Sequence, residues 1–110
     1  MKEEKFKIEF KYPWTMIPLE NAEEWINVVK GSLTEDDPLF KKEIFVSGRH
    51  EYEQLLLVEN DSDDNYAIVS VMNDRKAGKL ICKTIEVVKS VHALKERLKN
   101  DHQKATAKFK

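Results

Sequence analysis

The sequence predicts a small α+β domain, in which a mainly antiparallel sheet of about five strands carries two helices against one face. Four consecutive strand-like runs are joined by short polar links, and such links favour antiparallel hairpins over long crossovers. Two further segments repeat apolar residues at the three- and four-residue spacing of a helix. A chain of 110 residues has the usual size of one domain, so residues 1–110 are expected to form a single unit of order β-α-β-β-β-β-α.

The N-terminal elements are predicted to be a strand, an irregular segment and a helix. Residues 6–12 (FKIEFKY) alternate apolar and charged side chains, which is typical of a half-buried strand. Residues 13–18 (PWTMIP) begin and end with proline, so they are predicted to be irregular and to stay out of the sheet interior. Asn21, with Glu24 three residues later, is predicted to cap a helix that runs to about Gly31.

The rest of the chain is predicted to form four strands and a second helix. Ser90 is expected to cap this helix, on which Val91, Leu94 and Leu98 form a narrow apolar stripe. Residues 103–110 are expected to fray. The four strands are expected at KKEIFVSG (41–48), EYEQLLLVE (51–59), NYAIVSVM (65–72) and KLICKTIEVV (79–88).

Charge is distributed unevenly along the chain. With 19 basic and 20 acidic residues the formal net charge is −1, which gives no overall attraction to nucleic acid or to an anionic membrane. Residues 20–64 carry 13 acidic and 4 basic side chains, whereas residues 83–110 carry 8 basic and 3 acidic ones. The favoured interpretation is that the basic C-terminal helix lies near acidic surfaces of its own domain, because Glu96 and Asp101 interrupt the basic run. The alternative is a basic helix that binds an acidic partner or nucleic acid.

The chain is expected to be cytoplasmic. Its longest apolar runs, such as LLLV, are too short to cross a bilayer, and MKEEKFKIEF lacks the apolar stretch of a secretory signal. The single cysteine cannot form an internal disulfide, which fits a reducing compartment. The oligomeric state is left open.

The acidic segment NDSDDN at 60–65 is predicted to be a hairpin turn without a tightly bound cation. A calcium loop of the EF-hand type would need a glycine where Tyr66 stands and a closing glutamate where Met72 stands. Asn, Asp and Ser are favoured in turns because their side chains hydrogen-bond the local backbone. Weak binding of a cation by Asp61 and its neighbours is the alternative.

Catalytic motifs are missing from the sequence. The three glycines are far apart, so they cannot form a phosphate-binding loop, and no acid and base pair stands out among the many carboxylates. Cys82 alternates with Leu80 on one strand and is expected to be a buried structural residue. The candidate residues for an enzyme or ligand site are scattered along the sequence: Arg49, His50, Glu51 and Cys82.

The segment YPWTMIP is the strongest candidate for an interaction surface. Prolines stiffen an extended backbone, and tryptophan is favoured at binding hot spots. The alternative, which is favoured because tryptophan is usually buried, is that the segment closes the core under the first helix. The candidate interaction residues are Trp14, Met16 and Ile17 from this segment, with Asp61, Asp63 and Asp64 from the acidic turn.

Residues 37–71, about the middle third of the chain, resemble a group of short bacterial proteins of unassigned function. In that group a helix is followed by a "DPL" turn, and a later strand has the form "YAIVHLTW". Residues 37–39 (DPL) and 66–69 (YAIV) match these two motifs, whereas residues 70–73 (SVMN) depart from the second one. The resemblance implies a bacterial α+β domain with an accessory role, and it supplies no catalytic residues.

Together these observations favour a non-enzymatic protein-binding module of an accessory, regulatory or immunity type, with no cofactor and no metal. Its partner is expected to be another protein, and neither a membrane nor nucleic acid is favoured. The alternative is a small enzyme or ligand-binding domain with a site around Arg49, His50, Glu51 and Cys82. A deep polar pocket around those residues would favour the alternative.

Overall fold

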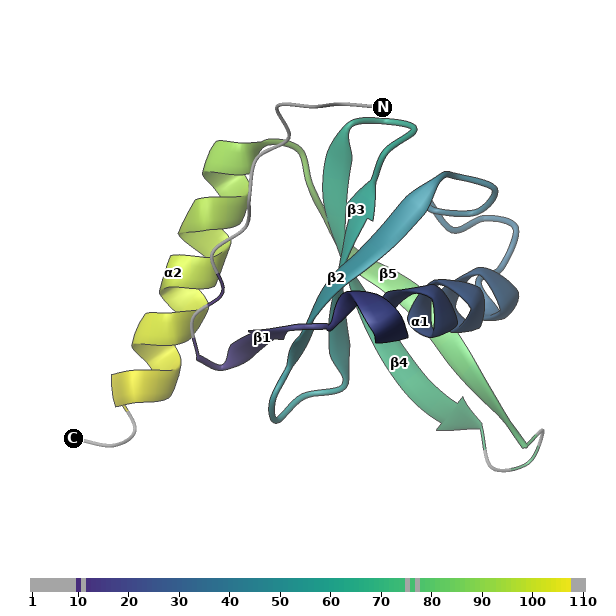
Figure 1. Cartoon of the computed structure of the whole chain (residues 1–110), viewed down its shortest axis with the longest axis horizontal. Helices are drawn as coiled ribbons and strands as arrows, with labels where there is room; N and C mark the ends of the chain where they lie inside the picture. The colour runs from purple at the N-terminus through teal and green to yellow at the C-terminus, as the bar shows by residue number, and fades with distance from the viewer. Residues whose placement is uncertain (1–9, 11, 75, 77, 108–110) are drawn as a thin grey trace.

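A computed structural model describes residues 10, 12–74, 76 and 78–107. It contains a five-stranded antiparallel sheet and two helices in the predicted order, so the α+β fold class is confirmed (Figure 1). The elements are β1 (Trp14–Met16), α1 (Leu19–Ser32), β2 (Ile44–His50), β3 (Leu55–Asn60), β4 (Asn65–Asp74), β5 (Lys79–Val88) and α2 (Val91–Ala107). Within the described residues, neither helix combines the length and the apolar character that crossing a membrane requires.

The sheet is a meander in which each strand pairs with the one that precedes it in the chain. The strand order is β1-β2-β3-β4-β5 and every neighbouring pair is antiparallel. Short connections permit this arrangement, because an antiparallel neighbour can be reached by a tight turn. β1 and β5 are therefore the two edges of the sheet.

The two helices cover opposite faces of the sheet, so the prediction that both lie against one face is wrong. On β3, Leu56 and Val58 belong to a core shared with α1, whereas Leu55 and Leu57 belong to a core shared with α2. Successive side chains of a strand point to opposite faces. In Figure 1 α1 crosses in front of the sheet and α2 stands to its left.

The core on the α1 side is the larger of the two. Residues from α1 and from β2 to β5 meet there, and the loop between α1 and β2 closes one end through Leu39, which is 1% exposed. We call it the α1-side core; its buried members are Ile17, Val29, Leu39, Ile44, Val46, Leu56, Val58, Ala67, Val69 and Cys82.

The α2-side core joins α2 to β1, β3, β4 and β5. The hydroxyl of Ser90 accepts a hydrogen bond from the backbone N–H of Ala93 at 3.1 Å, as predicted for the helix cap. The helix continues through Ala107, so residues 103–107 are helical, and residues 108–110 lie outside the described part of the chain. The buried members of this core are Trp14, Leu57, Tyr66, Ile68, Val88, Leu94 and Leu98.

The N-terminal elements differ from the prediction in position. Of the predicted strand 6–12, residues 6–9 and 11 lie outside the described part of the chain, and Phe10 and Tyr12 are not in a strand. The first strand is instead β1, in the segment predicted to be irregular. β1 is a short strand at the edge of the sheet, a position that is compatible with flanking prolines. α1 begins at Leu19 after Pro18, and Pro18, not Asn21, stands at its N-cap.

β2 extends further than the sequence predicts. Arg49 and His50 lie beyond the predicted strand 41–48, but they pair with β1, Arg49 with Thr15 and His50 with Trp14. Because β1 supplies a partner for these residues, β2 ends only at His50 and the chain turns at 51–54.

Candidate functional site

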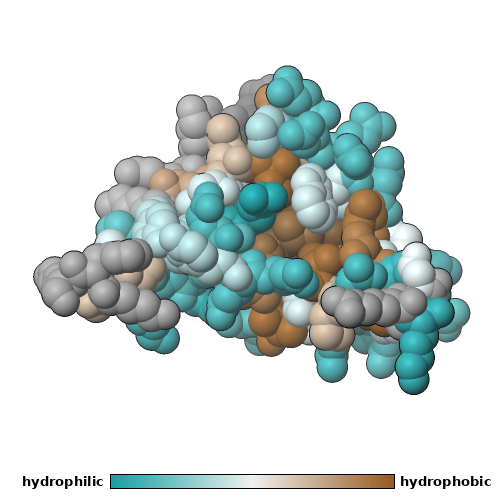
Figure 2. Space-filling view, turned by 90° about the horizontal axis from the view of Figure 1, so that it is seen from below, coloured by the Kyte–Doolittle hydropathy of each residue, from teal (hydrophilic) through white to brown (hydrophobic). Residues whose placement is uncertain are grey.

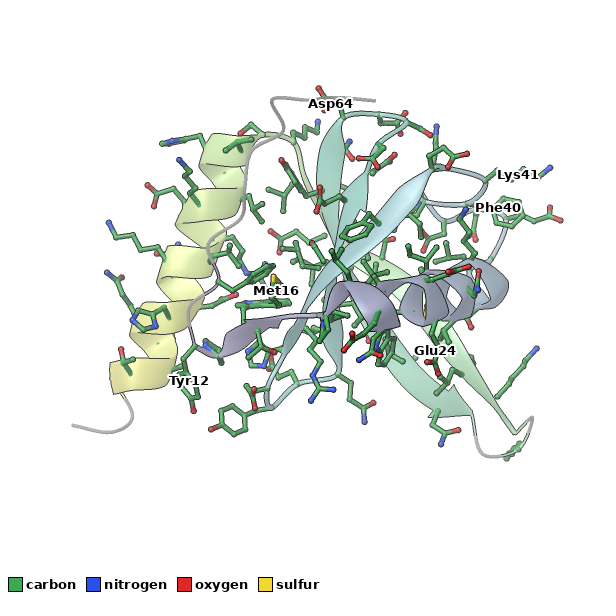
Figure 3. All side chains as sticks on the ribbon, viewed as in Figure 1. Tyr12, Met16, Glu24, Phe40, Lys41 and Asp64 are labelled. Carbon is green, nitrogen blue, oxygen red and sulfur yellow. The ribbon has the colours of Figure 1, made fainter. Side chains whose placement is uncertain are left out.

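A pocket of about 670 Å³ opens between the C-terminal half of α2 and the ends of β1 and β2. Figure 3 labels one of its residues, Tyr12, at the lower left beside α2. We call this space the α2 pocket. One wall is formed by Tyr12, Pro13, His50, Tyr52 and Glu53, and the other by Arg97, Asp101, Lys104 and Ala105.

The first wall consists of aromatic rings set nearly at right angles. Tyr12 and Tyr52 have ring centroids 5.7 Å apart with planes at 77°, and His50 and Tyr52 are 6.4 Å apart at 67°. The hydroxyl of Tyr12 donates a hydrogen bond to the hydroxyl of Tyr52. This hydrogen bond raises the pKa of Tyr12 to about 12. Tyr52 uses its oxygen as the acceptor, so its own O–H can be donated to a ligand.

His50 is fixed by the bend that follows β2. Its Nδ1 accepts hydrogen bonds from the backbone N–H groups of Tyr52 at 3.1 Å and Glu53 at 3.0 Å. A neutral imidazole that accepts at Nδ1 carries its proton on Nε2, which lies 3.7 Å from a carboxylate oxygen of Glu53. The lone pair of His50 is therefore committed to the backbone, and the side chain offers the pocket a donor and not a base.

The α2 wall contains a charge network that also positions the helix. Arg97 Nε donates to Asp101 at 3.1 and 3.3 Å, and Arg97 Nη1 donates to Glu86. Asp101 accepts a third hydrogen bond, 2.8 Å long, from the indole Nε1 of Trp14. Partial burial alone would lower the pKa of Arg97, but the hydrogen bonds to Glu86 and Asp101 raise it overall, so the guanidinium stays charged.

The α2 pocket therefore has spare hydrogen-bond donors and few spare acceptors. The oxygens of Asp101 are occupied by Arg97 and Trp14. Lys104 is exposed and makes no ion pair with any described residue. Glu53 is the one lining residue described here with a spare acceptor. Its side chain is 67% exposed, and its carboxylate oxygen lies 3.7 Å from Nε2 of His50.

The residues proposed for interaction in YPWTMIP separate into core and surface. Trp14 is 1% exposed and Ile17 is 4% exposed, so both lie in the cores and neither is available to a partner. Ile17 lies in the core under the first helix, as the favoured interpretation predicts, whereas Trp14 is buried in the α2-side core and not under the first helix. Met16 is 68% exposed and remains a surface candidate.

The acidic turn lies at the other end of β3 from the α2 pocket, and Figure 3 shows Asp64 at the top of the molecule. Asn60 Oδ1 accepts hydrogen bonds from the backbone N–H groups of Ser62 and Asp63, both at 3.1 Å. Asp63 also pairs with Lys42 at 3.2 Å, and Asp64 has a φ of 58°, a left-handed conformation that Asp tolerates. The predicted turn is confirmed.

All three predicted interaction residues in this turn, Asp61, Asp63 and Asp64, are exposed. Asp63 is committed to the fold of the turn by its bonds to Asn60 and Lys42. Within the described part of the chain, no group of three or more His, Cys, Asp or Glu side chains is placed to hold a metal ion.

The fold does not bring together the four candidate residues for a catalytic site, Arg49, His50, Glu51 and Cys82. His50 lines the α2 pocket, but Arg49, as the adjacent residue of β2, points to the opposite face of the sheet. Cys82 is 2% exposed in the α1-side core, and burial raises the pKa of its thiol. Glu51 is exposed on the bend. The fold separates the set across two faces.

The residues that the sequence analysis missed in the α2 pocket are Tyr12, Tyr52, Glu53, Arg97 and Lys104. They are ordinary surface residue types in three distant segments, so no local pattern marks them. The spacing of Arg97, Asp101 and Lys104 at three and four residues was visible, because such residues share one face of a helix. Comparison with models of protein families, with curated proteins and with solved structures found no match to this chain.

Proposed function

We propose that this chain is a non-enzymatic protein-binding module of an accessory, regulatory or immunity type. The observation that carries the proposal is the separation of charge between the two helices. On α1 the exposed acidic side chains Glu20, Glu23 and Glu24 outnumber the exposed basic Lys30. On α2 exposed basic side chains, including Lys95 and Lys99, outnumber the exposed acidic Glu96. The sheet lies between the helices, so the acidic excess and the basic excess lie on opposite faces of the molecule.

Separated charge of this kind affects how a partner approaches. A surface with one sign of charge attracts a partner of the opposite sign and orients it before contact, which raises the association rate. The formal net charge of −1 does not reveal this separation, because acidic and basic charges cancel when they are summed over the whole chain. The proposed partner is a protein with an acidic surface, which approaches the α2 side.

Exposed apolar side chains support a binding role as well. Met16 is 68% exposed, Leu19 81% and Met72 51%. Figure 2, which views the molecule from below, shows apolar surface in the middle of this side with hydrophilic regions around it. Apolar surface with a polar surround is typical of protein interaction sites.

The alternative function is a ligand-binding domain or small enzyme, and the α2 pocket is the observation that favours it. A pocket of about 670 Å³ lies in the size range of small-molecule sites. Catalysis is less well supported, because Nδ1 of His50 is occupied by two backbone N–H groups and Cys82 is buried in the other core. The proposal also includes a bacterial cytoplasmic location, for which the resemblance and the single cysteine are the support.

The test is to capture a partner from the source cell and to measure its association rate at low and physiological salt. We expect the rate to fall as salt rises, because surface charges are screened beyond about 8–10 Å at physiological ionic strength. The double variant Lys95→Gln with Lys99→Gln should slow association by about tenfold at low salt. The matched control, Glu23→Gln with Glu24→Gln on α1, should leave the rate unchanged or raise it.

Two results would count against the proposal. One is a captured partner whose association depends neither on salt nor on the α2 lysines. The other is turnover of a small molecule that disappears in His50→Ala while the folded state is retained, which would favour the enzyme.

A further inference from the structure

We infer that the α2 pocket binds a carboxylate of an acidic peptide segment, and that Lys104 and the donors of His50 and Tyr52 hold it. This inference rests on the proposed function and names the chemical group that the partner contributes. It is carried by the donors that the pocket leaves unused.

Three donors line the pocket without a strong partner of their own. The hydroxyl of Tyr52 accepts from Tyr12, so its own proton is available for a ligand. His50 accepts at Nδ1 and therefore presents Nε2–H, with only the exposed carboxylate of Glu53 nearby at 3.7 Å. Lys104 supplies a positive charge that no described residue neutralises.

The remaining charges of the pocket are already satisfied. Arg97 is held between Glu86 and Asp101, and Asp101 also accepts from Trp14. Arg97, Glu86 and Asp101 bond to one another and fix the wall, and together they carry a formal charge of −1. What is left is the cation Lys104, the neutral donors of His50 and Tyr52, and the exposed carboxylate of Glu53. The cation and the donors match the acceptor oxygens of a carboxylate.

The size and the walls of the pocket favour a side chain carried by a peptide. A volume of about 670 Å³ is much larger than one carboxylate, and the rings of Tyr12 and Tyr52 give an apolar surface for the attached methylene groups and backbone. Glu53 opposes an anion, but its exposed side chain can turn toward solvent. Neutralising Lys104 should therefore weaken binding of an anion at this site, and neutralising Glu53 should strengthen it.

The experiment is a ¹⁵N NMR titration of the protein with N-acetyl-glutamate N-methylamide. The indole N–H of Trp14 and the backbone N–H groups of Tyr52 and Glu53 border the pocket and serve as reporters, and the indole of Trp25, packed against the α1-side core, is the internal control. We expect saturable shifts of the three reporters and none of Trp25, with a dissociation constant on the order of 1–10 mM for so small a probe.

The controls vary the probe and the pocket. The neutral isostere N-acetyl-glutamine N-methylamide and the cationic lysine analogue should bind far more weakly than the glutamate probe. N-acetyl-alanine, which carries a free C-terminal carboxylate, shows whether a chain end is accepted as well as a side chain. Lys104→Gln should weaken binding of the glutamate probe by about three- to fivefold, and Glu53→Gln should strengthen it by a similar factor.

Equal shifts with the glutamine probe, preferred binding of the lysine probe, or the same affinity in Lys104→Gln would overturn the inference. If these results appear while a captured partner still depends on Lys95 and Lys99 for its association rate, the carboxylate site is wrong and the proposed binding function stands. If the glutamate probe binds as expected but no protein partner is recovered, the pocket is a carboxylate site and the proposed function fails.

Discussion

Replacing Trp14 by alanine is expected to lower the free energy of unfolding by about 3–5 kcal/mol. Trp14 is 1% exposed and packs in the α2-side core. Its indole N–H donates to Asp101 at 2.8 Å, and its ring meets that of His50 with centroids 5.3 Å apart. The substitution removes a large side chain from a packed core and deprives Asp101 of a partner, so a domain with a typical stability of about 5–15 kcal/mol loses a large part of it.

The measurement is equilibrium unfolding in denaturant, with two matched variants. Met16→Ala changes a residue of the same strand that is 68% exposed, and it should change the free energy of unfolding by less than about 0.5 kcal/mol. Trp14→Phe keeps much of the apolar volume but removes the N–H donor, so it should cost about 1.5–3 kcal/mol. A cost for Trp14→Ala no larger than that for Met16→Ala would contradict the placement of Trp14 in the core.

Replacing Asp37 by alanine is expected to cost about 2–3 kcal/mol, because its carboxylate joins the loop after α1 to the edge strand β5. Asp37 accepts hydrogen bonds from the backbone N–H of Thr84 at 2.8 Å and from its hydroxyl at 2.7 Å. It also accepts from the backbone N–H of Leu39 at 3.0 Å. Hydrogen bonds to a charged group are the stronger ones in proteins, and one substitution removes all three.

Asp36→Ala is the control, since Asp36 is exposed and its carboxylate accepts from the hydroxyl of its neighbour Thr34. It should cost no more than about 1 kcal/mol. A double-mutant cycle of Asp37→Ala with Thr84→Val should give a coupling energy of about 1 kcal/mol or more. Equal costs for Asp36→Ala and Asp37→Ala, or a coupling energy near zero, would show that the link to β5 does not stabilise the fold.

The elements that could be predicted from the sequence are those with strong local signals. The strand 79–88 and the helix cap at Ser90 agree with the structure, because an alternating run bounded by turn residues and a serine before an apolar stripe each act locally. The sequence also contains a signal that the two helices cover opposite faces of the sheet. The runs LLLV and YAIV are apolar at nearly every position, which is typical of strands buried on both faces.

The α2 pocket and the role of Asp37 could not be predicted in the same way. Asp37 was read as part of a local "DPL" turn, but its strongest bonds reach Thr84, 47 residues away. The pocket brings together residues 12–13, 50–53 and 97–105, and its position depends on β1 pairing with the end of β2. Contacts between such distant segments are set by tertiary packing, which local propensity does not encode.

Selection of a random displayed-peptide library against the folded protein shows whether the α2 side binds an acidic segment of another protein. We expect enriched peptides that contain Asp or Glu and whose binding weakens as salt rises. Their binding should also weaken in Lys104→Gln and remain unchanged in the α1 control Glu24→Gln. Enrichment of basic peptides, the absence of any enriched sequence, or equal binding to Lys104→Gln and the unmodified protein would contradict this expectation.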